Sequence, residues 1–352
     1  MVAARGRARG CEKWNNGMKI LNEHIQNAYK VLAGGMLSRE EAIALDREVN
    51  GPELLDLLSL ANKVREKYVP GVQVCSILNA KSGVCSQNCK FCAQSAHHDT
   101  HIETYPLLDG EKVLDAVKTV YDSGVRSFGY VTSGYGYLKP DEEFFSIMAV
   151  LDAIHAEYPD LNICVSLGIL SEETAKILSE HHCARYNINL QTAPAKYAEL
   201  IADTHTIQEK IDTIKYLQSF GVKICCGGIF GLGETSVDRI DMALAVRDLD
   251  VDGIPLNVLM PIPGTPLAGR PIMEPYEVAK SFALFRLLNP KKMIKFAAGR
   301  ETALKDFQGL LMLSGVNALM TGGYLTTRGR SVEEDQKFIE RLNKFNLKAE
   351  NI

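Results

Sequence analysis

The sequence lacks any apolar run that approaches the roughly 18 residues of a membrane-spanning helix. Its formal net charge of −4 gives no electrostatic reason to expect nucleic acid or an anionic membrane surface as a partner. A secretory signal is also missing, because the basic leader contains no apolar segment. The nine cysteines are therefore expected to be metal ligands or buried thiols of a cytoplasmic protein, and not disulfides.

The composition is that of an ordinary globular protein, with 46% hydrophobic and 23% charged residues. A length of 352 residues exceeds the usual limit of one core, although α/β barrels reach it as single domains. We expect a disordered leader over 1–17, helices over 18–70, a barrel over 71–345 and a tail over 346–352. Helical patterns at 39–47 and 53–68 are separated by turn residues, which supports the helical segment.

After residue 70, short apolar or β-branched runs alternate with longer amphipathic stretches. The amphipathic stretches predict helices, among them 172–182, 207–220, 237–249, 276–288 and 304–314. The predicted strands are 72–80, 127–133, 162–168, 185–191, 223–231, 253–261, 293–300 and 318–325. Such alternation predicts an α/β fold, and we expect a (β/α)8 TIM-type barrel with an N-terminal helical extension. The rival is a doubly wound open sheet, which would place a glycine-rich phosphate loop after its first strand. No Gly-x-Gly-x-x-Gly follows that strand, so the barrel is favoured.

Three cysteines, Cys85, Cys89 and Cys92, follow the first predicted strand with the spacing C-x3-C-x2-C. In a barrel this loop lies at the catalytic end. Three thiolates without a nearby fourth suit an iron–sulfur cluster with one open iron, whereas a structural zinc ion requires four ligands. The nearby histidines at 97, 98 and 101 leave zinc as an alternative.

A second group of thiols is distributed over separate predicted strands, at Cys75, Cys164 and the pair Cys225 and Cys226. A buried cysteine is usually only a small hydrophobic residue. Side chains alternate along a strand, so only one of Cys225 and Cys226 can face the barrel interior. Three inward thiols from three strands would form a second metal site, deeper than the first.

The sequence resembles the radical S-adenosylmethionine (SAM) enzymes, because Phe91 completes the signature C-x3-C-x-aromatic-C. From about residue 20 to the C-terminus it resembles the biotin synthase family. The segments that carry this resemblance include Tyr186–Leu190, Gly227–Thr235, Ala298–Glu301 and Leu325–Thr327. The resemblance implies insertion of one sulfur into dethiobiotin to give biotin, with 5′-deoxyadenosyl radicals made from SAM at a 4Fe-4S cluster. It also implies an auxiliary iron–sulfur cluster as sulfur donor, a reductant such as flavodoxin or ferredoxin, and a homodimer.

The resemblance assigns roles to individual residues. Cys85, Cys89 and Cys92 would hold the 4Fe-4S cluster. SAM would be bound by the side chains of Phe91, Asn189, Gln191, Lys210 and Ile229, of which Asn189 and Lys210 are counted as catalytic. Dethiobiotin would be bound by Asn187, Asn189, Asn257, Thr326 and Thr327. Without the resemblance, an Asn at a strand end and a Thr pair before a helix are more simply read as local hydrogen-bonding residues.

The chain departs from the usual family pattern at the auxiliary cluster. Gly129 and Lys295 stand where the family has a cysteine and an arginine, whereas Cys75 stands where it has a serine facing the same cavity. We expect a cluster rebuilt around Cys75, Cys164 and Cys225, as a 2Fe-2S or a four-iron type. Ser127 shares the direction of Gly129 and is the predicted oxygen ligand.

Rival functions remain at this point. Within the radical SAM enzymes they are a methylornithine-forming mutase and the hydrogenase-maturation relatives. A zinc-binding or cluster-sensing regulatory protein is the rival of another class, although the basic surface expected of a nucleic-acid-binding regulator is absent.

Overall fold

The computed structural model describes residues 21–326 and 329–346, so the expected leader over 1–17 lies outside the described residues. The largest sheet is parallel and closes on itself, because β9 pairs with β10 as well as with β7 and β8. Its order in space is β10-β11-β1-β2-β4-β6-β7-β9-β8. The strands are β1 (Gln73–Lys81), β2 (Ser127–Thr132), β4 (Asn162–Ser166), β6 (Arg185–Asn187), β7 (Lys223–Cys225), β8 (Gly228–Phe230), β9 (Gly253–Val258), β10 (Met293–Phe296) and β11 (Ala318–Met320). The predicted barrel is confirmed.

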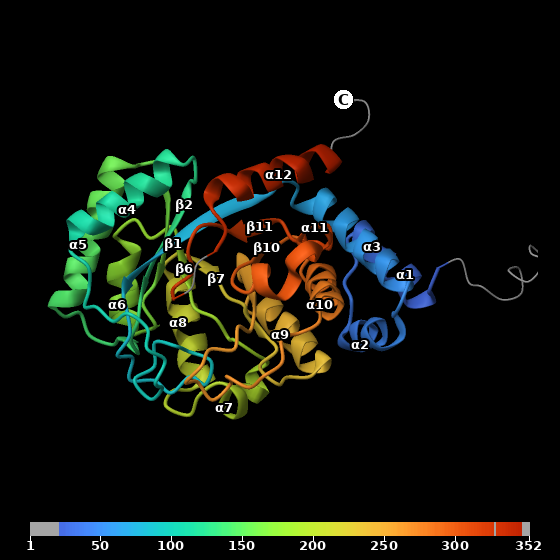
Figure 1. Ribbon diagram of the computed structural model, residues 1–352, viewed down its shortest axis with the longest axis horizontal. Helices are drawn as coiled ribbons and strands as arrows, with labels where there is room; N and C mark the ends of the chain where they lie inside the picture. Colours follow the sequence, from blue (N-terminus) through green and yellow to red (C-terminus); the bar gives the residue numbers. More distant parts are fainter. Residues whose placement is uncertain (1–20, 327–328, 347–352) are drawn as a thin grey trace, which may run out of the picture.

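Helices surround the barrel and cover the outer faces of its strands (Figure 1). They are α4 (Gly110–Asp122), α5 (Glu142–Glu157), α6 (Glu172–Ser179), α7 (Tyr197–Leu200), α8 (Ile207–Ser219), α9 (Ser236–Asp248), α10 (Pro275–Leu288), α11 (Gln308–Met312) and α12 (Val332–Asn346). Capping boxes built on Ser171, Thr206 and Thr235 start α6, α8 and α9. Each box satisfies amide donors that the first turn of a helix leaves free. These local signals explain why the sequence located the helix starts closely.

Within the described residues, three α-helices precede the barrel and lie at one side of it, beside α9 and α10 (Figure 1). They are α1 (Glu23–Ala28), α2 (Arg39–Glu48) and α3 (Glu53–Tyr68). Helix α3 packs on α10 and α2 packs on α9, and their buried faces join the main core. Arg39 adds a bidentate ion pair with Asp241 of α9, at 2.5 and 2.9 Å. The extension is therefore packed against the outer helices of the barrel.

The fifth predicted strand, 223–231, is divided into β7 and β8. Between them, Gly227 and Gly228 lie very close to neighbouring backbone. A Cβ at Gly227 would lie 1.9 Å from the Pro255 carbonyl oxygen, and one at Gly228 would lie 2.5 Å from the Gln191 carbonyl oxygen. Only glycine fits there. The amide of Ile229 donates to the Gln191 carbonyl at 2.9 Å, which fixes Gln191 beside β8.

The predicted helix at 304–314 is only partly correct. Residues 300–304 form a π-helical turn, 305–307 form a 3-10 turn, and regular α-helix is confined to α11. The buried Arg300 is held by a bidentate ion pair with Asp335 of α12, with both distances 2.9 Å. This long-range anchor, together with Gly299 at a φ of 92°, sets the backbone path and overrides the helical pattern.

The outer faces of the strands and the inner faces of the helices form one large core. Phe230, Phe282, Phe285 and Phe296 make a contiguous aromatic group within it, with ring centroids 5.0 to 5.6 Å apart. Among the described residues, no helix combines the length and apolarity that crossing a membrane requires. The barrel interior, by contrast, carries polar groups and thiols.

Candidate active site

The loop after β1 carries Cys85, Cys89 and Cys92 at the carboxyl ends of the barrel strands. Backbone hydrogen bonds shape it: the Cys85 amide donates to Gln94 at 2.9 Å, and the Cys92 amide donates to Cys89 at 3.0 Å. All three cysteines line a cavity of about 150 Å³. The small sheet of β3 (Gly136–Tyr137) and β5 (Ile169–Leu170) lies next to this cavity, and Ile169 is one of its lining residues. The structure therefore brings the three cysteines together as predicted.

Burial disfavours the thiolate forms of Cys89 and Cys92. It raises the pKa of Cys89 to about 12, with a contribution from Cys92, and raises the pKa of Cys92 to about 11. Lys210 of α8 lines the same cavity, and its positive charge partly opposes the upward shift in the pKa of Cys89. Burial in turn lowers the pKa of Lys210. Because metals bind thiolates, a metal at this site must displace thiol protons, and an adjacent cation assists that exchange.

The nearby histidines do not face the thiols as zinc ligands would. The Nε2 atoms of His97 and His98 lie 3.0 and 3.1 Å from the carbonyl oxygens of Ser86 and Cys89. His205, which the sequence did not indicate, lies closer to the thiols, with Nε2 4.0 Å from the Cys89 sulfur and 2.6 Å from the Tyr197 hydroxyl. In the part of the chain that the structure describes, no three His, Cys, Asp or Glu side chains converge to hold a single ion.

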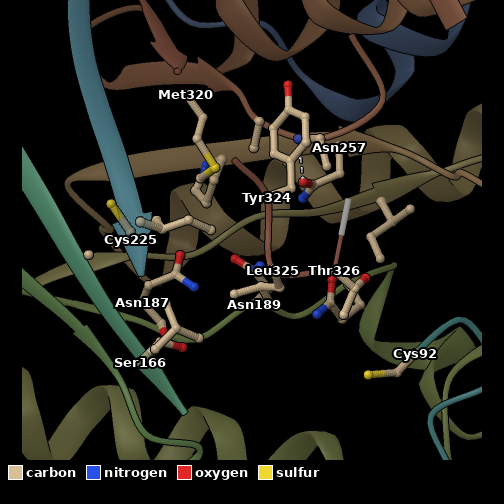
Figure 2. A pocket seen from close by; sticks show the side chains of 18 of the residues that line it. Cys92, Ser166, Asn187, Asn189, Cys225, Asn257, Met320, Tyr324, Leu325 and Thr326 are labelled. Atoms are coloured by element: carbon tan, nitrogen blue, oxygen red, sulfur yellow. Dashed lines mark hydrogen bonds between the residues drawn. The ribbon is translucent and has the colours of Figure 1, made fainter. Parts of the chain in front are cut away.

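A larger cavity of about 380 Å³ occupies the barrel interior. Figure 2 shows Cys92 at one side of the view and Cys225 at the other, with Asn187 and Asn189 between them. Cys75 and Cys164 also line this cavity. One continuous cavity therefore links Cys92 of the loop to the inner thiols. Cys226 points the other way, into the main core, as strand alternation predicts.

The inner thiols come from β1, β4 and β7 and lie beside two further polar side chains. Ser127 Oγ lies 3.7 Å from Cys164 Sγ, so the predicted oxygen ligand is next to a predicted sulfur ligand. Lys295 of β10 also lines the cavity. Burial lowers the pKa of Lys295, but Cys75, Cys225 and Cys164 oppose this so strongly that the net shift is upward. Three thiols and a nearby hydroxyl form a donor set that fits an iron–sulfur cluster.

The space where a side chain at Gly129 would lie is filled by Ile77 of the neighbouring strand β1. A Cβ at Gly129 would lie 2.8 Å from Ile77 Cγ2, closer than real contacts allow. A cysteine side chain at 129 would therefore clash with Ile77 unless Ile77 moved. This contact provides a structural reason why position 129 holds no ligand in this chain.

The three asparagines differ in what their amides already bind. Asn189 Oδ1 accepts from the Gly227 amide at 3.0 Å, which leaves its NH2 group free to donate into the cavity. Asn257 accepts from the Ala298 amide at 2.9 Å and donates to the Gly228 carbonyl at 3.1 Å, so one N–H remains. The side-chain amide of Asn187 makes the fewest hydrogen bonds of the three within the described structure. All three line the large cavity.

The remaining predicted residues also lie around this cavity. Phe91, Gln191, Ile229 and Thr326 line it, whereas Thr327 lies outside the described residues. Phe91 packs against a cluster that includes Ile229, and Gln191 adopts a φ of 71°, with its side-chain Oε1 buried and unpaired within the described structure. Their assignment to SAM remains a prediction.

Hydrogen bonds across the mouth of the large cavity make one connection that the sequence did not indicate. Asn79 of β1 donates to Gln94 Oε1 at 3.1 Å and to the Leu325 carbonyl at 3.3 Å. Gln94 lies next to the cysteine loop, and Leu325 precedes Thr326. Tyr324 is held as well, because its hydroxyl donates to the Glu301 carboxylate at 2.9 and 3.0 Å. The segment carrying Thr326 is thus anchored at both sides of the mouth.

Comparison with known proteins agrees with this arrangement. Residues 80–246 match the Radical SAM superfamily, and residues 255–344 match the Biotin and Thiamin Synthesis associated domain. The biotin synthase of Chlorobium phaeovibrioides is 54% identical over 330 residues, covering 93% of this chain and 99% of the relative. That of Chlorobaculum parvum is 53% identical over 330 residues, covering 92% and 98%.

Solved structures show the same fold at low identity. Methylornithine synthase (PylB) has a TM-score of 0.77 and 19% identity, covering 90% of this chain and 96% of its own. The hydrogenase maturase HydG from Carboxydothermus hydrogenoformans has a TM-score of 0.75 and 19% identity, covering 91% and 78%. A parallel barrel with three thiols in the loop after its first strand defines a radical SAM enzyme. The chain belongs to the biotin synthase family, whose activity is radical SAM sulfur insertion in biotin synthesis.

Proposed function

We propose that this protein converts dethiobiotin to biotin and that one barrel cavity holds all the reacting groups. The observation that carries this proposal is the continuity of that cavity from Cys92 of the loop to Cys75, Cys164 and Cys225 inside the barrel. A radical generated at one end must reach the substrate, and the sulfur donor must lie on the substrate's other side. A volume of about 380 Å³ lies within the range of small-molecule sites.

Cys85, Cys89 and Cys92 would hold the 4Fe-4S cluster, which supplies the electron that cleaves SAM to a 5′-deoxyadenosyl radical. The protein's part is to bind and orient SAM. Lys210 lines both cavities and offers a positive charge to the SAM carboxylate. Phe91 and Ile229 offer apolar contacts to the adenosine part, and the unpaired Gln191 Oε1 is an acceptor for a donor of SAM.

Dethiobiotin would lie between the two thiol groups. Its ureido carbonyl accepts hydrogen bonds, and Asn189 presents a free NH2 group beside the less committed Asn187. Asn257 adds one N–H. The carboxylate tail would lie near Thr326, which follows the residues held by Asn79 and Glu301, and would also contact Thr327, which lies outside the described residues. These contacts would set which carbons face the radical.

Cys75, Cys164 and Cys225 would hold the auxiliary cluster, with Ser127 as an additional oxygen ligand. When bound, that cluster supplies the sulfur atom inserted into the substrate. The cavity suits a sacrificial donor because it lies inside the barrel and adjoins the groups proposed for the substrate. A flavodoxin or ferredoxin as reductant, a cytoplasmic location and a homodimer complete this proposal.

Anaerobic turnover tests the proposal. Dethiobiotin should stimulate SAM cleavage and yield biotin. Cys89→Ala should abolish formation of 5′-deoxyadenosine, whereas Cys75→Ala should retain uncoupled cleavage but lose biotin and the second cluster's iron. Cys226→Ala is the matched control: it removes an outward thiol next to Cys225 and should cost only packing, about 1 kcal/mol. Conversion of a methylornithine precursor without conversion of dethiobiotin would instead identify the mutase.

A further inference from the structure

Arg185 is the first residue of β6 and lies near two of the inner cysteines in the sheet register. In the sheet register Cys164 pairs with Arg185, and Cys225 pairs with Asn187 two residues further along β6. Residues two apart on a strand share a face, so Arg185 faces the interior with Asn187. Asn187 lines the cavity. Arg185 therefore lies level with Cys164 and two residues before the level of Cys225, toward the amino-terminal ends of the strands.

The contacts of Arg185 lead to Cys225. Its Nη1 lies 3.9 Å from the sulfur of Met293, and Met293 forms a small buried cluster with Cys225 and Ala318. Space there is tight, since a Cβ at Gly253 would lie 2.5 Å from Met293 Cε and 2.9 Å from Cys225 Sγ. The Arg185 guanidinium and the Cys225 thiol are thus both packed against Met293.

The hydrogen-bonding capacity of Arg185 is largely unused. A guanidinium has five N–H donors and no acceptor, and burying its charge without a partner is costly. Nε is buried with no partner in the described structure, and Nη1 has only a thioether sulfur. No carboxylate among the described residues forms an ion pair with it. The unpaired Nε is therefore a donor that suits an acceptor or an anion beside the inner thiols.

The charges beside the inner thiols also favour an anion. Burial lowers the pKa of Arg185, but Cys225, Cys164 and Asp252 outweigh it, so the net shift is upward. Lys295 places a second cation beside the same thiols. A bare divalent cation would meet two positive charges there, whereas a thiolate-ligated cluster carrying sulfide is an anion. The two cations therefore favour binding of an anion beside the inner thiols.

We propose that Arg185 is a positioning residue of the auxiliary-cluster site, a fixed positive charge that retains an anionic, sulfide-bearing cluster against Cys164 and Cys225. This inference rests on the proposed function, because it requires the inner thiols to hold a cluster. Arg185 takes no part in SAM cleavage. It acts on how firmly the cluster is held and on how easily the cluster accepts an electron.

The test compares Arg185→Met, Arg185→Lys and Lys223→Met in the anaerobically purified, cluster-loaded protein. Lys223 is the matched control, because it pairs with Arg185 in register but is exposed. The readouts are iron and sulfide per chain, release of inner-cluster iron to a chelator, and the midpoint potential of the inner cluster. Arg185→Met should lose inner iron about 10–100-fold faster, as expected for loss of an outer-shell partner, and should shift the potential downward. Arg185→Lys and Lys223→Met should release inner-cluster iron at nearly the rate of the parent protein and should keep nearly its midpoint potential.

The outcomes separate this inference from the proposed function. If the parent protein holds an inner cluster and makes biotin, but Arg185→Met changes neither iron release nor potential, the role of Arg185 is wrong. A parent protein without any inner cluster contradicts the proposed function itself. If Arg185→Met fails to fold, Arg185→Gln carries the same expectation, because it removes the charge but keeps polarity. If Arg185→Lys releases inner-cluster iron as fast as Arg185→Met, the argument from positive charge is also wrong.

Discussion

Gly129→Cys is expected to destabilise the protein, because Ile77 occupies the space that the new side chain needs. The added Cβ would lie 2.8 Å from Ile77 Cγ2 and 3.5 Å from Ile77 Cβ, whereas optimal carbon contacts are about 3.5–4.0 Å. Ile77 is β-branched and has few alternative rotamers, so it cannot turn away easily. Overpacking of this kind costs about 1–3 kcal/mol in the free energy of unfolding.

A double-mutant cycle measures the clash directly. Ile77→Ala removes Cγ2 and leaves only the ordinary 3.5 Å contact, so it should relieve the strain. Ile77→Val keeps Cγ2 and should not relieve it. We expect Gly129→Cys to be coupled favourably to Ile77→Ala by about 1–3 kcal/mol, and to Ile77→Val by close to zero.

The assay is anaerobic urea denaturation followed by far-UV circular dichroism, with the free energy of unfolding compared across the single and double variants. Gly129→Cys with unchanged stability would contradict the reasoning, as would equal relief by Ile77→Val. The result also bears on the cluster. Gly129→Cys combined with Lys295→Arg should restore the usual family ligand set only when Ile77 is also reduced in size.

Three further predictions concern other parts of the molecule. Lys210→Met should raise the KM for SAM more than Lys210→Arg does, because only the second keeps a positive charge beside the Cys89 thiol. Equal KM values for the two variants would contradict that role. Arg300→Met should lower the free energy of unfolding by up to about 3–5 kcal/mol, because it leaves the buried Asp335 carboxylate with only the 3.7 Å contact to Arg330. Adding Asp335→Leu should recover much of that loss in urea denaturation. Hydrogen bonds from Lys30, Ser38 and Asn27 lower the pKa of Glu41 to about 2, so its stabilising effect is complete above its ordinary pKa and fades as pH falls toward 2. Glu41→Gln should therefore lower Tm at pH 7 but have progressively less effect between pH 4 and pH 2.

The barrel strands could be predicted because each is a short apolar run between clear helical patterns. The starts of α6, α8 and α9 were predictable for a local reason as well, since Ser171, Thr206 and Thr235 satisfy first-turn amides within four residues. The segment after Gly299 could not be predicted in this way. Its backbone path depends on Asp335, which is far away in sequence, and no local pattern contains that contact.

The cysteine loop shows how far the sequence could define the site. The spacing of Cys85, Cys89 and Cys92 indicated one shared site, and the structure places them around one cavity. Strand alternation also separated Cys225 from Cys226 correctly. The same rule would have placed Arg185 on the face of Asn187, but a lone arginine at a strand start carried no signal until the register showed what lies opposite it.

The amino-acid sequence by itself determined the eight-strand pattern, the loop thiols and the family, because these depend on local periodicity and on spacing along the chain. Only the tertiary structure decided that one cavity joins Cys92 of the loop to the inner thiols, that Ile77 closes the space beside Gly129, and that Arg185 lies beside Cys164. The physical reason is the closure of the barrel. Closure brings side chains from eight distant segments into one interior, where contacts depend on register and packing and not on separation along the chain.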